Sequence, residues 1–304
     1  MKQNITAALL FASLNAFALS SMSLFAKLMG DYYGPIEVTF FRNLASFALL
    51  VILLLALREI PSLLKTKRPW AHFIRSAIGT TGMIFGMWSY QISPLALATL
   101  LYFTSPLFVA LLSYPVLGEK VGPYRIASVV AGFVGVAIIA LPAFSEYGAA
   151  AGITVLGVIV GIIYGFSAGC VDLCLRYLGD TESSKTTTFY FLLFGIIATG
   201  LYWPFSEYDP YLHSQATYFI IAGLGITGIV SLLAKSQSFR LAPASFVAPV
   251  AFTMIIWAGL FDYFIWDKLP GWPLILGGTI IIASNLVIAW REQRKKIKEN
   301  ENTL

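Results

Sequence analysis

The stretch PIEVTFFRNLASFALLVILLLAL, residues 35–57, is a long apolar run that opens at a proline. At about 1.5 Å per residue it is long enough to cross a hydrocarbon core of roughly 30 Å as a helix. One arginine, Arg42, lies well inside it. Because a charge at that depth costs a few kcal/mol, we expect Arg42 to face protein or water rather than lipid. The stretch predicts a membrane-spanning helix that carries one costly charge.

The whole chain has the composition of a membrane protein. Of its 304 residues, 58% are hydrophobic and 12% are charged, against roughly 25% charge in soluble chains. The net charge of +5 is spread over predicted loops and a short tail, so we expect no nucleic-acid partner. Cys170 and Cys174 lie one helical turn apart, with no other metal-ligand residues nearby. We therefore expect no disulfide, no metal and no cofactor.

Ten apolar runs of about 20 residues follow one another with short connections between them. These runs are 6–28, 35–57, 71–91, 95–117, 123–142, 151–178, 185–204, 215–239, 243–265 and 271–290. They predict an all-α integral membrane protein with ten transmembrane helices, in contact with the lipid bilayer.

Lysine and arginine indicate how these helices are oriented, because cytoplasmic loops of membrane proteins are enriched in both. With the N-terminus inside, 17 of the 20 basic residues fall on the cytoplasmic side or on adjoining helix ends. They are Lys2, Arg58, Lys65, Lys67, Arg68, Arg75, Lys120, Arg125, Arg176, Lys185, Lys235, Arg240, Arg291, Arg294, Lys295, Lys296 and Lys298. We predict that both termini are cytoplasmic.

An internal repeat relates the two halves of the chain. A shift of 149 residues superposes four short matches: Gly30-Asp31 on Gly179-Asp180, Thr39-Phe40 on Thr188-Phe189, Phe103-Thr104 on Phe252-Thr253, and Pro94 on Pro243. The same shift pairs the first apolar run with the internal segment 154–177. A cleaved signal peptide, which the triplet Ala16-Phe17-Ala18 could suggest, is therefore disfavoured.

Each half, 1–145 and 146–304, then holds five spans, the second half ending in a short basic tail. Because five is odd, the second half enters the membrane in the opposite orientation, which predicts two inverted five-helix repeats. Such repeats can exchange conformations around a site near the midplane, as alternating access requires. A bundle of this kind needs no second copy to form its site, although a homodimer is compatible with it.

The chain also resembles a known family. FFRNL in the second run and SPLALATLLYFTSPLFVALLSYPVLGEKVGPYRIASVVAGFVGVAII, residues 93–139, are similar to the EamA-type branch of the drug/metabolite transporter superfamily. The resemblance covers almost the whole chain and is most specific from Pro94 to Gly122. It implies a small-metabolite carrier in the bacterial inner membrane. FAK at residues 25–27 and PIEVTFFRNL are most similar to members that carry S-adenosylmethionine or riboflavin.

Arg42 is the first candidate for substrate recognition, since a guanidinium binds carboxylate or phosphate in a bidentate way. The alternative is structural: Arg42 could reach the headgroups or interact with Glu37. Other substrate-binding candidates are polar or aromatic residues at suitable depth: Asn15, Trp88, Tyr90, Tyr102, Tyr164 and Trp257. Asn15 could equally bond to another helix, and many aromatic residues of such a chain face lipid.

Candidates for gating or coupling are Lys27 and Arg176, which the repeat pairs, together with Asp172 and Pro106. Lys27 either extends toward the headgroups or forms one of two symmetric gate contacts, Arg176 forming the other, with Asp31 and Asp180 available as counter-ions. Asp172 and Asp262 are acids within spans, and either could pair with a basic residue or serve as a proton-coupling site. For Asp262 we favour solvation at its span end. Pro106 lacks a backbone donor and should kink its helix.

Gly157, Gly161, Gly165 and Gly169 recur every fourth residue and predict a flat stripe for close helix packing. Gly165-Phe166-Ser167-Ala168-Gly169 also fits the pattern G-x-S-x-G of serine hydrolases. An intramembrane hydrolase using Ser167 and His72 is an unfavoured alternative, because the motif lies within an apolar helix. We predict no enzyme but a secondary transporter for a small polar or amphipathic metabolite of amino-acid, nucleotide-like or vitamin-like type. A non-transporting receptor or scaffold is the alternative.

Overall fold

The computed structural model describes residues 4–56, 58, 66, 68–118, 122–145, 152–179, 182–208, 215–241 and 244–301. Within these residues the secondary structure is helical. The helices are α1 (Ile5–Met29), α2 (Pro35–Ala56), α4 (Pro69–Ile92), α5 (Leu95–Tyr102), α6 (Ser105–Leu117), α7 (Pro123–Ala140), η1 (Leu141–Phe144), α9 (Val155–Gly179), α10 (Ser184–Gly200), η2 (Trp203–Phe205), α11 (Gln215–Leu241), α12 (Ala244–Ala251), α13 (Thr253–Trp266) and α14 (Trp272–Glu301).

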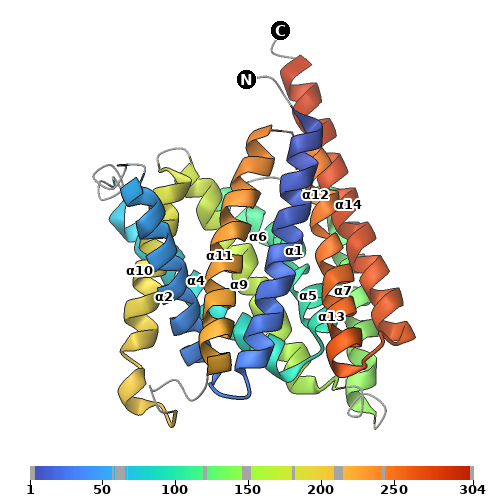
Figure 1. Cartoon of the computed structure of the whole chain (residues 1–304). Helices are drawn as coiled ribbons and strands as arrows, with labels where there is room; N and C mark the ends of the chain where they lie inside the picture. Colours follow the sequence, from blue (N-terminus) through green and yellow to red (C-terminus); the bar gives the residue numbers. More distant parts are fainter. Residues whose placement is uncertain are drawn as a thin grey trace.

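The long helices form one bundle, and both termini lie at the same end of it (Figure 1). In the described part of the chain, nine helical stretches are long and apolar enough to cross a membrane. The predicted run 71–91 is α4, which has 24 residues but stands outside the nine. His72, Arg75 and several hydroxyl side chains make α4 less apolar than its neighbours. The tenth span therefore stays a prediction.

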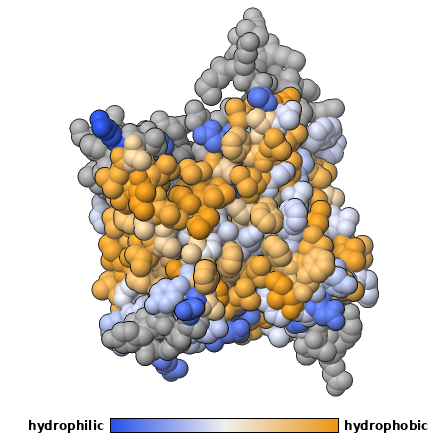
Figure 2. All heavy atoms as spheres, in the orientation of Figure 1, coloured by the Kyte–Doolittle hydropathy of each residue, from blue (hydrophilic) through white to orange (hydrophobic). Residues whose placement is uncertain are grey.

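The outer surface is apolar over the height of the bundle, with hydrophilic residues gathered toward its two ends (Figure 2). Large side chains such as Leu10, Phe219 and Phe264 are exposed. A soluble protein rarely exposes apolar area on this scale, whereas lipid tails solvate it without cost. The protein is thus an integral membrane protein.

The fourth predicted span is broken into α5 and α6 at Phe103 and Thr104. Pro106, in the first turn of α6, lacks the N–H that would continue the α5 ladder. The Thr104 hydroxyl instead donates to Leu101 O at 2.6 Å. The kink predicted from Pro106 is confirmed, and it is a full break in the helix.

A second break separates α12 from α13 at Phe252, one repeat length of 149 residues after Phe103. There the Thr253 hydroxyl donates to Val250 O at 2.7 Å, which repeats the Thr104 bond at the shifted positions. The rings of Phe103 and Phe252 stack with centroids 4.8 Å apart. A residue that contacts its own shifted counterpart lies where a two-fold axis between the halves would pass.

The helix neighbours follow the same shift. α1 packs on α11, α12 and α13, and its counterpart α9 packs on α4, α5 and α6. α2 contacts α11 as α10 contacts α4, while α7 packs on α14. The glycine stripe of α9 allows close helix packing as predicted, and the structure shows that its partner is the broken helix: a Cβ on Gly165 would lie 2.6 Å from Leu101 O. The C-terminal tail continues α14 as helix to Glu301, beyond the span end expected at 290.

Candidate functional site

Arg42 is buried inside the bundle, with 9% of its surface exposed. It lies about 10 Å along α2 from Pro35, at about 1.5 Å per residue. Its Nη1 donates to Asn43 Oδ1 at 2.9 Å, and its buried Nε has no hydrogen-bond partner. The Nε and Nη2 edge faces α11, where Gly228 supplies no side chain: a Cβ there would lie 3.4 and 3.5 Å from these two atoms. Arg42 therefore neither reaches the headgroups nor pairs with Glu37.

A second arginine, Arg75, is partly buried and turns two guanidinium nitrogens into the bundle, although the sequence assigned it to the cytoplasmic helix ends. Its guanidinium carbon is 4.3 Å from the centre of the Phe191 ring on α10. Its Nε and Nη1 are buried without a hydrogen-bond partner. The charges of Arg42 and Asp172 lie near enough to act on it. The charge count assigned Arg75 to a helix end because the predicted run began at residue 71.

The signal that could have found Arg75 was its depth from the proline that opens its helix. Arg75 lies about as far from Pro69 as Arg42 lies from Pro35. Neither arginine makes an ion pair with an acid of the described residues. Two guanidiniums with buried nitrogens and no carboxylate in ion-pair contact carry an electrostatic cost in the empty protein, which Asp172 offsets only from a distance.

Further unpaired polar groups accompany the two arginines on α2 and α4. Asn43 Nδ2 and Thr80 Oγ1 both point at Gly195 of α10 and have no partner, and Ser76 Oγ, one turn from Thr80, is also unpaired. We call Arg42, Asn43, Arg75, Ser76 and Thr80 the donor cluster. The Asn43 oxygen accepts from Arg42, while its Nδ2 is unpaired. The two guanidiniums and this amide supply more donors than the cluster's oxygens supply acceptors.

Three of the predicted aromatic residues lie together beside this cluster. The hydroxyls of Tyr90 and Tyr164 are 3.2 Å apart, and the rings of Tyr102 and Tyr164 have centroids 5.1 Å apart. Tyr164 is close enough to Arg42 for an electrostatic interaction. These tyrosines form an aromatic wall next to the arginine.

Trp88 and Trp257 lie apart from the tyrosine group. Trp257 is 36% exposed and packs edge-on against Phe17 at 5.1 Å on the outside of the bundle. The ring contact of Trp88 is with Phe85 on its own helix. Both were selected by depth and residue type, which do not reveal the face of the helix. The structure does not bring them to the donor cluster.

The structure gives different partners to the predicted residues Asn15 and Asp172 and describes only the backbone of Arg176. Asn15 is buried and accepts a hydrogen bond of 2.8 Å from Ser231 of α11, which is the helix-to-helix role kept open above. Asp172 accepts from Ser105 of α6 at 3.2 Å, directly beside the break in the fourth span. The backbone of Arg176 belongs to α9, while its side chain lies outside the described residues.

The expected counter-ion of Lys27 was wrong. Asp31 is exposed and Asp180 lies outside the described residues, whereas Lys27 Nζ is 3.6 Å from Asp262 Oδ1 on α13. Asp262 is 3% exposed, so the expected span-end solvation is also wrong. Lys27 further donates to Ser93 O at 2.7 Å and lies 4.5 Å from the Trp266 ring centre. The two charges join α1 to α13 and to the α4–α5 connection.

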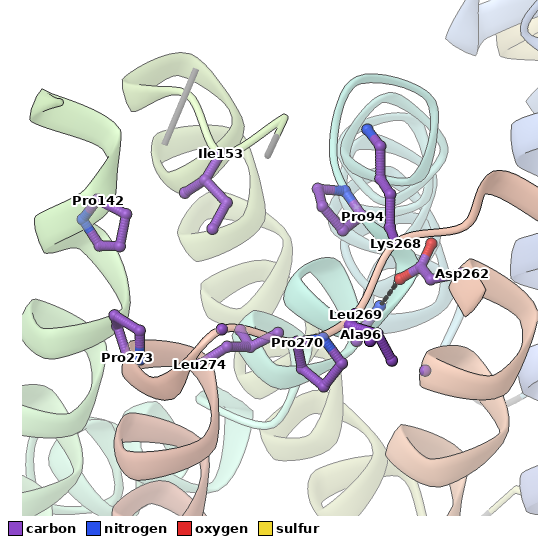
Figure 3. Close-up of a pocket in the computed structure, with 12 residues that line it drawn as sticks. Pro94, Ala96, Pro142, Ile153, Asp262, Lys268, Leu269, Pro270, Pro273 and Leu274 are labelled. Carbon is purple, nitrogen blue, oxygen red and sulfur yellow. Dashed lines mark hydrogen bonds between the residues drawn. The ribbon is translucent and has the colours of Figure 1, made fainter. Parts of the chain in front are cut away.

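Asp262 also caps α5 from another helix. Its carboxylate accepts from the backbone N–H groups of Leu95 at 3.0 Å and Ala96 at 2.9 Å. A carboxylate at a helix N-terminus satisfies orphan donors and complements the helix dipole. Figure 3 shows this contact at the wall of a cavity of about 30 Å³. Metabolite sites are typically about 300 Å³ or larger, so this cavity is too small for a metabolite while Lys27 and Asp262 close this end by their contact.

A larger hollow of about 330 Å³ lies between α4, α6 and α9. Its lining is apolar apart from two cysteines and Tyr177. Cys174, in that lining, lies within electrostatic range of Arg75. The hollow thus comes close to the donor cluster from the side of α9.

The geometry of Ser167 does not fit a hydrolase. Ser167 packs directly on Gly82 of α4, where an added Cβ would lie 2.6 Å from the serine Cβ. His72 is ten residues earlier on α4, hence about 15 Å away along the helix axis. His72 Nε2 lies 3.5 Å from Glu182 Oε2 instead. A serine needs its histidine base within hydrogen-bond distance, which this arrangement does not provide.

Comparison with known proteins supplies the family. A profile of the EamA-like transporter family matches residues 6–141 and again residues 155–290, the same 149-residue shift as the internal repeat. The chain belongs to the EamA-like transporter family. This confirms the resemblance noted in the sequence and places the protein among transporters.

Two relatives of this EamA-like transporter are named for their substrates. The S-adenosylmethionine uptake transporter of Rickettsia bellii (strain RML369-C) is 27% identical over 284 residues, covering 92% of each chain. The riboflavin transporter of Rhizobium johnstonii (strain DSM 114642 / LMG 32736 / 3841) is 27% identical over 235 residues, covering 77% of this chain and 75% of that protein. A crystal structure with a TM-score of 0.63 and 18% identity covers 95% of this EamA-like chain and 98% of its own, and shows the same fold.

Proposed function

We propose that this EamA-like protein is a secondary transporter that moves a small polar or amphipathic metabolite across the bacterial inner membrane by alternating access. The observation that carries the proposal is the buried guanidinium of Arg42, whose Nε has no hydrogen-bond partner, inside a member of a transporter family. A structural arginine would be expected to have an acid or a carbonyl partner for Nε. A substrate-binding arginine is left unpaired until its ligand arrives.

The substrate class follows from the named relatives. S-adenosylmethionine combines an amino acid with a nucleoside, and riboflavin is a planar vitamin. The tyrosine group of Tyr90, Tyr102 and Tyr164 offers aromatic faces for a planar ring, and Arg42 beside Tyr164 offers charge-assisted donors. Both substrates are candidates for this chain.

Alternating access is supported by the paired architecture. The equivalent breaks at Phe103 and Phe252, the contact between these two rings, and the matching helix neighbours fit two inverted five-helix repeats, 1–145 and 146–304. In this proposal the Lys27–Asp262 contact closes one gate, and the breaks near Pro106 and Phe252 are hinges. Asp172, bonded across to Ser105 at the first break, and Arg176 are candidates for the opposite gate.

The test is uptake into proteoliposomes that contain the purified protein, with radiolabelled S-adenosylmethionine and riboflavin supplied separately. We expect uptake of one of them above that of protein-free vesicles, and a loss of at least about tenfold in uptake efficiency for Arg42→Gln. Arg291→Gln removes an exposed arginine far from the cluster and serves as the matched control. Ligand-dependent stabilisation without movement into the vesicles would instead support the receptor alternative.

The proposed orientation places both termini in the cytoplasm and the Lys27–Asp262 contact on the outer side. The basic residues near the termini end of the bundle support it. A green fluorescent protein fused after Leu304 should therefore fluoresce, since it folds in the cytoplasm. Activity of alkaline phosphatase at the same position, which needs export, would reverse the orientation.

A further inference from the structure

The donor cluster lacks the acceptors that would neutralise it. Arg42 Nε, Asn43 Nδ2 and two nitrogens of Arg75 are buried N–H groups without partners. Each such group costs on the order of 1–3 kcal/mol, and more when it is charged. Several such N–H groups lie on α2 and α4, and this cost is offset only when a ligand supplies hydrogen-bond acceptors to them. The chemistry that matches unpaired N–H donors is an oxygen-rich anion.

The free edge of Arg42 is suited to a carboxylate. Asn43 occupies Nη1, which leaves Nε and Nη2, the parallel pair of donors that binds two carboxylate oxygens side by side. Gly228 keeps this edge clear, because any side chain at that position would cover it. Asn43 therefore orients the guanidinium while leaving its binding edge open.

Arg75 supplies a second positive charge to the same region from the neighbouring helix. Its guanidinium carbon lies 4.3 Å from the centre of the Phe191 ring, a contact that orients a guanidinium without using its hydrogen-bond donors. The positive charges of Arg42 and Arg75 are near enough to repel one another. Asp172, the nearby acid, is bonded to Ser105 and forms no ion pair with either arginine. An anion between the two arginines would relieve the repulsion and pair both.

We propose that Arg42 and Arg75 form a two-arginine oxyanion site that binds the carboxylate of the transported metabolite. This site deepens the proposed function and rests on it only in that the bound metabolite is taken to be transported. Binding of the anion can be tested without transport. The proposal makes Arg75 a specificity-determining residue: substrates with the anionic group bind, and close analogues without it are rejected.

The experiment compares matched pairs of probes that differ only in the anionic group, by thermal shift and calorimetry on detergent-purified protein. The pairs are S-adenosylmethionine with its decarboxylated form, and riboflavin 5′-phosphate with riboflavin; acetate at tens of millimolar is the minimal probe. We expect the anionic member of at least one pair to bind at least about tenfold more tightly in wild type. Arg75→Gln and Arg42→Gln should abolish that difference, and Arg75→Lys should restore part of it.

The melting temperature of the ligand-free protein distinguishes a folding defect from a binding defect. Since Arg75 carries an uncompensated charge, Arg75→Met should melt at the same or a higher temperature than wild type without ligand, while no longer responding to anions. Arg291→Gln should respond as wild type does. Equal binding of both members of each pair, no anion response in wild type, or an Arg75→Gln response equal to wild type would each overturn the site.

Two other outcomes are informative. If phosphatidylglycerol in the micelles stabilises wild type and blocks every soluble probe, the anion is a lipid phosphate and the metabolite site is overturned. Arg75-dependent anion binding without vesicle uptake would keep the anion site and overturn transport. Uptake without Arg75-dependent discrimination between the two members of a probe pair would support transport and overturn the anion site.

Discussion

At the scale of single residues, Gly228 decides whether Arg42 can offer its free edge. A Cβ on Gly228 would lie 2.7 Å from Ser46 Oγ, which must therefore move, and would touch the free edge of Arg42 at 3.4 Å from Nε, so Gly228→Ala partly covers that edge. We expect at least a severalfold rise in the KM for uptake, with a fall in unfolding free energy of about 1–3 kcal/mol. Uptake kinetics and thermal melting of the same preparation measure both effects.

The matched control is Gly259→Ala in α13, where an added Cβ meets no heavy atom within 4 Å. Alanine is favoured over glycine inside a helix by about 0.5–1 kcal/mol, so this variant should be slightly more stable and transport normally. If Gly228→Ala transports as well as Gly259→Ala does, the edge of Arg42 that faces α11 is not a binding edge.

At this scale the sequence predicts how far along its helix a residue lies, but not which face of the helix it occupies. Arg42 was found because its distance from Pro35 could be counted. Trp257 and Trp88 were misplaced because these helices are apolar on every side, so periodicity gives no face. Asp31 was chosen as counter-ion because it is one turn from Lys27, whereas the actual partner, Asp262, is brought there by packing of α13 on α1.

At the scale of elements, Asp262 holds three helices with one carboxylate. Asparagine in its place keeps one acceptor oxygen for the two N–H groups of Leu95 and Ala96 and leaves Lys27 without a counter-ion. We expect Asp262→Asn to lower the unfolding free energy by about 1–3 kcal/mol, and Asp262→Ala by about 3–5 kcal/mol, because a buried charge is left unpaired. Detergent-titration unfolding measures these losses.

The same change should open the closed end of the bundle. A single cysteine at Ala96, in a chain with Cys170 and Cys174 replaced by alanine, should react faster with a soluble maleimide once Asp262 is asparagine. Asp31→Asn removes an exposed acid one turn from Lys27 and is the control. Equal effects of Asp31→Asn and Asp262→Asn on stability and labelling would mean that the contact is not a gate.

The elements themselves were largely readable from sequence, because hydrocarbon thickness fixes their length. Each predicted run coincides with a described helix, except that two runs are broken. The first break could be anticipated from Pro106. The second was present in the repeat as the match of Phe103-Thr104 with Phe252-Thr253, but a sequence match does not say that a helix stops there. The structure shows it, because α12 ends at Ala251 and α13 begins at Thr253.

At the scale of the whole molecule, the halves are alike in architecture and different in charge. The shift places Phe191 opposite Arg42 and Gly79 opposite Gly228, and each glycine makes room for the large side chain of its pair. One half uses that room for an arginine and the other for a phenylalanine, against which Arg75 stacks. The two halves therefore share their helix arrangement, while the buried arginine at this position belongs to the first half alone.

If the two breaks are equivalent hinges, damage to either should have the same effect. Thr104→Val and Thr253→Val each remove a hydroxyl bond to a carbonyl three residues back, at Leu101 and Val250. Each should cost about 0.5–1.5 kcal/mol and slow uptake to a similar degree. The reason is that one cycle of alternating access moves both hinges, so a loosened hinge on either side shifts the balance between the two end states.

Thr279→Val tests whether this effect belongs to the breaks. Thr279 makes a similar bond, 2.8 Å to Ile275 O, but it is exposed on the continuous helix α14. Its loss should leave uptake unchanged. Uptake that falls for Thr104→Val and stays normal for Thr253→Val would show that only the first half moves, and a transporter with one moving half does not need the exchange of conformations that inverted repeats provide.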